Sequence, residues 1–199
     1  MSKLTTNLVT TIALSVLVLF TLLDKIEVDR RMLARPLSSS RLKTGDLLLF
    51  SESAAVRALQ LSCVSHAAVV VCNRRGSPWI FEIRPENKRP SLMPLADLPA
   101  ETQVYVRRLS RALPLRRVVE YVRLTRGNAY SHTYFRAAFN LPIDSTRPFC
   151  SSLVTGLYLF CGVLTHEAAT FLPKDLLRGR LPTAPGFRFS AMSTVVRGR

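Results

Sequence analysis

Short apolar runs alternate with stretches of helical periodicity between residues 47 and 161 of the chain. Continuous runs of four to eight apolar residues bounded by turn residues are typical of buried strands. They predict strands at residues 47–50, 67–72 and 79–83, the last two joined as a hairpin around residues 76–78. Apolar and polar residues alternate at 103–107, which predicts a further strand with one exposed face.

Three stretches repeat their apolar residues at helical spacing. Residues 54–62 do so briefly, and residues 113–125 place valine and leucine on one face and arginine on the other, which predicts an amphipathic surface helix. Residues 150–161 follow Pro148 and are apolar nearly all round, which predicts a buried helix that ends at Gly162. Residues 181–199 show no strong periodicity and are expected to form a loosely packed basic tail.

An uncharged stretch of 20 residues, from Leu4 to Leu23, precedes these elements. As a helix it would be about 30 Å long, close to the thickness of a bilayer's hydrocarbon core. A cleaved signal peptide is the alternative, because several threonines dilute its first half. No small-residue cleavage site follows Leu23, so we expect residues 1–23 to be an uncleaved transmembrane anchor.

Basic residues set the expected orientation of this anchor. Lys3 stands before the apolar stretch, and four basic residues follow it closely, namely Lys25, Arg30, Arg31 and Arg35. The positive-inside rule then predicts a single-pass protein whose C-terminal domain faces the cytosol, or the equivalent matrix or virion interior. Residues 24–43 hold charges, Pro36 and a serine run, and they are expected to form a tether between anchor and domain.

Composition and charge narrow the function classes. With 199 residues and 48% hydrophobic residues, the chain is one domain's worth of sequence and too apolar to be disordered. Residues 37–199 hold 23 of the 28 Lys and Arg residues but 10 of the 13 Asp and Glu residues, so the domain itself is basic. Anionic lipid surfaces are expected partners. Aromatic residues make up only 8% and no RNA or DNA module is recognisable, which argues against specific nucleic-acid binding.

The cysteines indicate neither a disulfide scaffold nor a regular metal site. The chain has four of them, none in a C-x-x-C pair: Cys63, Cys72, Cys150 and Cys161. Cys63, His66 and Cys72 form a C-x2-H-x5-C pattern to which Cys150 could add a fourth ligand. Structural zinc sites normally use two tight pairs on turns, so this spacing disfavours metal, and no cofactor is expected.

A candidate nucleophile, base and orienting acid occur in the order His66, Glu82, Cys150. The N-terminus of a helix and a neighbouring imidazole both favour the thiolate form of a cysteine, and the start of the predicted helix at Cys150 offers the first. His66 precedes a predicted strand and Glu82 lies on the next one, where a carboxylate could orient the imidazole. Cys63, Cys72 and Cys161 are interpreted as core residues, and His132 and His166 as surface or loop residues.

Several short motifs in this order resemble the circularly permuted papain-like branch of the NlpC-type superfamily, which includes YiiX-like hydrolases and their lecithin:retinol acyltransferase and poxvirus relatives. The motifs lie between Lys43 and Leu177: Lys43-Thr44-Gly45-Asp46, Ser65-His66-Ala67, Phe81-Glu82, Gly127-Asn128-Ala129-Tyr130, Phe149-Cys150-Ser151-Ser152-Leu153-Val154 and Leu172-Pro173-Lys174-Asp175-Leu176. In this branch the histidine strand precedes the cysteine helix, as it does here. One position differs from the family's pattern: Ser152 stands where the family commonly has glutamate.

The resemblance implies an α+β domain at residues 44–180, in which a small antiparallel sheet packs against the cysteine-bearing helix. It also implies a thiol hydrolase or acyltransferase that acts on an amide or ester bond of a lipid or peptide, with Cys150, His66 and Glu82 as catalytic residues. The alternative is a basic, membrane-held adaptor that keeps the fold without the chemistry and serves a larger membrane or virion assembly. A mitochondrial inner membrane would also suit the basic N-terminus.

Overall fold

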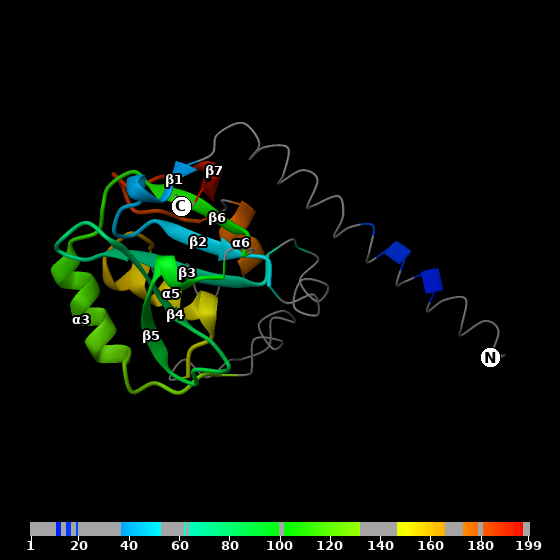
Figure 1. Ribbon diagram of the computed structural model, residues 1–199, viewed down its shortest axis with the longest axis horizontal. Coiled ribbons are helices and arrows are strands. Elements are labelled where there is room, and N and C mark those ends of the chain that lie inside the picture. Colours follow the sequence, from blue (N-terminus) through cyan, green and yellow to red (C-terminus); the bar gives the residue numbers. More distant parts are fainter. Residues whose placement is uncertain are drawn as a thin grey trace.

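An antiparallel sheet with helices packed against it forms the centre of the molecule (Figure 1). The computed structural model describes residues 11–12, 15–16, 19, 37–52, 62, 64–99, 102–131, 147–165, 173–178 and 181–196. From residue 37 onward its elements are β1 (Leu37–Ser38), the 3-10 helix η1 (Ser39–Arg41), β2 (Leu47–Phe50), β3 (His66–Cys72), β4 (Pro78–Ile83), β5 (Pro90–Pro94), the 3-10 helix η2 (Leu95–Asp97), β6 (Val104–Leu109), α3 (Leu115–Thr125), α5 (Cys150–Phe160), α6 (Pro173–Arg178) and β7 (Phe189–Val196).

The sheet has the strand order β1-β7-β6-β2-β3-β4-β5. All neighbouring strands are antiparallel except β1 and β7, which pair in parallel over two residues. The predicted hairpin is β3–β4, in which Cys72 pairs with Pro78. An antiparallel sheet packed against α5 confirms the expected α+β class.

Both faces of the central strands are covered, which explains why their sequences are continuous apolar runs. Side chains alternate between the two faces of a strand. Leu47 and Leu49 of β2 therefore join one apolar cluster, which includes residues of α3, α5 and α6, while Leu48 and Phe50 join a second cluster with residues near η1 and η2. A strand buried on both faces cannot show the alternating pattern of a half-exposed strand.

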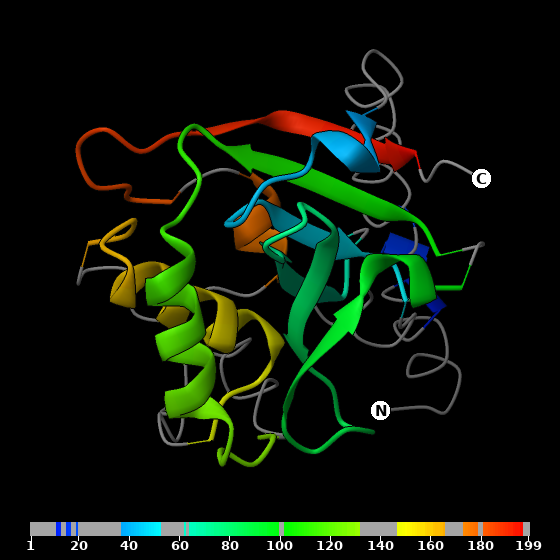
Figure 2. The same cartoon turned by 60° about the vertical axis from the view of Figure 1, so that its left-hand side comes forward.

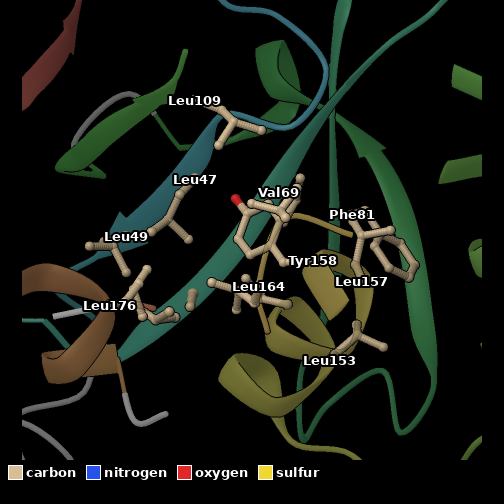
Figure 3. Close-up of a cluster of buried hydrophobic side chains, with 14 of the residues drawn as sticks. Leu47, Leu49, Val69, Phe81, Leu109, Leu153, Leu157, Tyr158, Leu164 and Leu176 are labelled. Atoms are coloured by element: carbon tan, nitrogen blue, oxygen red, sulfur yellow. The ribbon is translucent and has the colours of Figure 1, made fainter. Parts of the chain in front are cut away.

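The larger cluster holds α5 against the sheet. Figure 3 shows Leu153, Leu157 and Tyr158 of α5 facing Val69 of β3 and Phe81 of β4. The Tyr158 ring also lies 5.3 Å from the ring of Phe189 in β7, measured between centroids. This packing fixes the helix, and with it the position of Cys150 at its first turn.

The turn before β2 depends on Gly45. Its φ of +98° lies in the left-handed region that favours glycine, and its carbonyl accepts a 3.0 Å hydrogen bond from the hydroxyl of Tyr158. A Cβ at this position would lie 2.6 Å from Cγ of Leu113, so a side chain would also displace the core.

We expect Gly45→Ala to lower the free energy of unfolding by about 3 kcal/mol, since backbone strain and overpacking each cost about 1–3 kcal/mol. Urea denaturation measures the loss. Gly127→Ala is the matched control, because a Cβ there meets no atom within 4 Å, and it should change stability by less than about 1 kcal/mol. Equal effects of the two substitutions would refute this account of Gly45.

The C-terminal region differs from its prediction. The loose tail expected over residues 181–199 is wrong for Phe189–Val196, which form β7 and pair with β6 (Figure 2). The strand mixes polar and small residues with apolar ones, and it pairs with residues 80–89 positions earlier. Such pairing leaves no local periodicity in the sequence. The short elements β1, β5 and α6 were likewise not predicted, and β1 lies within the expected tether.

Two expectations concern residues that the structure does not describe. Most of the helix expected at 54–62 and most of the stretch 4–23 lie outside the described residues. Within the described part of the chain, no helix has both the length and the apolar character needed to cross a membrane.

Candidate active site

The register of β3 and β4 brings His66 and Glu82 together. Val69 pairs with Phe81, so Glu82 lies opposite Ala68 and diagonally across from His66, the first residue of β3. Diagonal neighbours on one face of an antiparallel pair are within reach of long side chains. Nε2 of His66 and Oε2 of Glu82 are 2.8 Å apart, a hydrogen-bond distance, and both side chains are buried.

Both oxygens of the Glu82 carboxylate have a partner. Oε2 contacts His66, and Oε1 accepts a 2.6 Å hydrogen bond from Nε of Arg84. Burial raises the pKa of this carboxyl, but the hydrogen bonds and charges of His66 and Arg84 lower it more, so its pKa lies below the usual value. Glu82 is therefore a fixed negative charge at neutral pH.

Arg84 connects Glu82 to a second carboxylate and to the ring beside His66. Its two terminal nitrogens donate hydrogen bonds of 2.9 and 2.8 Å to the two oxygens of Glu52. Its guanidinium lies 5.9 Å from the centroid of the Phe50 ring, and that ring lies 5.4 Å from the His66 ring. Burial lowers the pKa of Arg84, but the two carboxylates raise it above its usual value. This planar, paired arrangement restricts the rotation of the Glu82 carboxylate.

Sequence reasoning missed Arg84 and Glu52. The available signal was the period of two, because Arg84 follows Glu82 by two residues and Glu52 follows Phe50 by two. Residues two apart on extended chain point to the same side. β2 and β3 pair Phe50 with His66. The residues that follow β2 and those that follow β4 therefore lie at the same end of the sheet.

Cys150 is the first residue of α5, and it is only 8% exposed. Burial lowers the pKa of His66, but Cys150 and Glu82 together outweigh burial and raise that pKa to about 9. The hydrogen bond of Glu82 and the electrostatic influence of Cys150 thus act on one imidazole, which keeps its proton at neutral pH.

Ser152 caps the N-terminus of α5. Its hydroxyl oxygen accepts a 2.9 Å hydrogen bond from the Phe149 N–H and donates a 3.0 Å bond to the Phe149 carbonyl. Ser152 is the third residue of the helix, where a glutamate would also reach back to the N–H of the residue before the helix. The departure from the family pattern therefore preserves this cap rather than disrupting the helix around Cys150.

The remaining sulfur and imidazole groups do not join this site within the described residues. Cys72 lies at the opposite end of β3 from His66, so these two members of the C-x2-H-x5-C pattern do not converge. Burial raises the pKa of Cys161 to about 11, and it also raises the pKa of Cys72. In the parts of the chain that the structure describes, no cluster of His, Cys, Asp and Glu is arranged to hold a metal ion. Cys63, His132 and His166 lie outside those parts.

We compared the chain with curated proteins and with models of protein families. Among curated proteins, none matches the chain. The model of a family described as permuted papain-like amidase enzymes, YaeF/YiiX, C92 family, matches residues 41–180. This span includes β2 to β6, α3, α5 and α6, and so all the residues around His66 described above. The chain therefore belongs to the permuted papain-like amidase family.

Proposed function

We propose that the protein is a cysteine amidase in which Cys150 is the nucleophile, His66 the general acid and base, and Glu82 the residue that orients His66. The observation that carries this proposal is the buried Glu82–His66 contact of 2.8 Å on an imidazole whose pKa Cys150 also raises. Because Nε2 of His66 faces Glu82, Nδ1 is the ring nitrogen left for the sulfur. The family match supports hydrolase chemistry of this type.

In the first half-reaction, the Cys150 sulfur attacks the carbonyl carbon of an amide while His66 holds the proton. An S–C bond forms, the C=O π electrons move to oxygen, and a tetrahedral intermediate results. When it collapses, the C–N bond breaks and the His66 proton passes to the leaving nitrogen. The products are a free amine and a thioester on Cys150, with His66 now neutral.

In the second half-reaction, neutral His66 takes a proton from water as the water oxygen attacks the thioester carbon. The C–S bond breaks, the carboxylic acid leaves, and the sulfur and the protonated imidazole return to their starting states. An amine or alcohol in place of water would give acyl transfer by the same route. Ester substrates require only a different leaving group.

The first turn of α5 is suited to hold the negative oxygen of both intermediates. The N–H groups at the start of a helix have no acceptor within the helix, and the helix dipole is positive there. The Phe149 N–H is already used by Ser152, which leaves the N–H groups of Cys150 and its successors. We therefore assign the oxyanion site to backbone N–H groups of this turn.

Detection of a thioester on Cys150 tests this proposal directly. The full chain is incubated with peptides, N-acyl amino acids and N-acyl lipids, quenched in acid, and digested for mass spectrometry. The proposal expects the acyl mass of at least one substrate on the Cys150 peptide, lost on treatment with hydroxylamine. If none of these classes acylates Cys150, while the folded domain is intact by circular dichroism, the non-catalytic adaptor becomes the better reading.

We further propose that residues 4–23 anchor this domain in a membrane and that the substrate is a lipid or a peptide near its surface. The described residues of this stretch are helical, and Ile12, Val16 and Leu19 are each about half exposed. Exposed aliphatic side chains at this spacing suit contact with lipid tails. After alkaline carbonate extraction, the full-length chain should stay in the membrane pellet; its release into the supernatant would exclude an integral anchor.

A further inference from the structure

A groove of about 740 Å³ runs along α3. This helix lies on the outside of the molecule (Figures 1 and 2). One wall is the outward side of α3, and Arg74 in the turn between β3 and β4 contributes to the other. The lining consists of guanidinium groups, one carboxylate and aliphatic side chains: Arg74, Leu115, Arg116, Val119, Glu120, Arg123 and Leu124.

The charge of this groove is positive. Arg74, Arg116 and Arg123 make no ion pair with any residue that the structure describes. Glu120 is within 3.4 Å of Arg117, which lies outside the lining, so its charge is already compensated. Three arginines that line one groove favour a ligand with phosphate or carboxylate groups.

The apolar part of the groove narrows the ligand class. Leu124 is 64% exposed, more than any other large hydrophobic residue in the described part of the chain. No residue of the lining is aromatic, so the groove lacks the stacking platforms that single-stranded nucleic acids use. Aliphatic residues among arginines on an amphipathic helix are typical of helices that lie at the surface of an anionic membrane.

The Arg74 side of the groove lies apart from His66. Arg74 follows the last residue of β3 by two positions, whereas His66 is the first residue of that seven-residue strand. At about 3.3 Å per residue, the two ends of β3 are about 20 Å apart. A headgroup bound at Arg74 would therefore not be the group that reacts at His66.

We propose that this groove is a docking surface for an anionic phospholipid bilayer. Arg74, Arg116 and Arg123 bind the phosphate and carboxylate groups of the lipid headgroups, and Leu124 enters the boundary with the acyl chains. The surface is distinct from the stretch 4–23, and it sets which side of the domain faces the membrane. Near an anionic surface each arginine adds about fivefold to the binding constant, and this gain falls with salt.

Arginine footprinting of the full chain in vesicles tests the proposal without interference from the stretch 4–23. The chain is reconstituted in vesicles of phosphatidylcholine alone, or with about 30% phosphatidylserine, and treated with phenylglyoxal. Mass spectrometry then gives the modification rate of each arginine. Arg41 and Arg89 are matched controls, because both are exposed and neither lines the groove.

We expect phosphatidylserine to slow modification of the three groove arginines at least fivefold, and the two controls less than twofold. The protection should disappear in about 0.5 M NaCl. In a variant with Arg116→Gln and Arg123→Gln, the protection of Arg74 should fall, whereas Arg41→Gln with Arg89→Gln should leave it unchanged.

Three results would overturn the docking surface. Equal rates in neutral and anionic vesicles would show that the groove does not meet the lipid. Equal protection of groove and control arginines would show that the domain's overall charge, rather than this groove, is attracted. If 10 mM inorganic phosphate in neutral vesicles protects the groove arginines as well as phosphatidylserine does, the groove binds a free anion instead of a bilayer.

Discussion

Replacing Cys150 by serine should reduce turnover of any substrate that acylates the protein by about 10³-fold or more. A serine hydroxyl beside His66 would have to lose a proton that it holds much more tightly than a thiol does. The change removes no packing volume of note, so the free energy of unfolding should change by less than about 1 kcal/mol. Rates are measured at substrate saturation, and stability by urea denaturation.

Thiol labelling distinguishes a nucleophilic Cys150 from a cysteine that has only a structural role. In the wild-type chain, iodoacetamide at pH 6 should label Cys150 in preference to Cys72 and Cys161, whose pKa values burial raises. His66→Ala should abolish this preference because the proton acceptor is lost. Cys161→Ser, in the turn that ends the same helix, is the control and should leave both turnover and Cys150 labelling intact. Slow labelling that ignores His66→Ala would mean that Cys150 is an ordinary buried thiol.

Glu82→Gln should lower kcat/KM at pH 7 by about 10²-fold or more and move the alkaline limb of the pH profile to lower pH. The amide keeps the shape and a hydrogen bond but removes the charge that helps to raise the pKa of His66 to about 9. The imidazole then loses its proton at a lower pH, and the proton for the leaving amine is lost with it. Glu52→Gln is the control: it changes a partner of Arg84 but leaves the Glu82–His66 contact, so the limb should move little.

The raised pKa of His66 also predicts how the free energy of unfolding depends on pH. A group whose pKa is higher in the folded state stabilises the fold fully below its unfolded pKa, and that stabilisation is lost as the pH rises through the folded pKa. For His66 the loss should therefore extend from about pH 6.5 to about pH 9. The unfolding free energy of the wild type should fall across this range, and that of Glu82→Gln should fall less. Parallel curves for both proteins would show that Glu82 does not act on His66.

The sheet was predictable where burial leaves a local signature. The strands β2 and β3 are buried on both faces, so their apolar runs stand out in the sequence, and α5 stands out because nearly all its sides are covered. The strands β5 and β7 were not predictable in this way. Only one of the five residues of β5, Leu92, is exposed, but two of the others are prolines and one is serine. Tertiary pairing, not local pattern, makes these segments strands.

The contact between His66 and Glu82 was predictable from the sequence, but the residues that support it were not. The order of the motifs pointed to Cys150, His66 and Glu82, and short spacing along neighbouring strands made contact between the last two reasonable. The period of two indicated on which side of the chain Arg84 and Glu52 lie, but no local pattern showed that the two side chains pair behind Glu82. Long charged side chains reach across strands in many directions, so which carboxylate an arginine meets depends on the register of three strands rather than on any one of them.

The position of β7 limits where the domain can be truncated. The family match ends at residue 180, yet Tyr105, Val106 and Arg107 of β6 pair with residues 192–194. A fragment that stops at the family boundary would leave the hydrogen-bonding edge of β6 bare, and a bare strand edge recruits strands from other molecules. Such a fragment should self-associate even though it keeps every residue around His66. Functional work on this protein therefore needs the chain through residue 196.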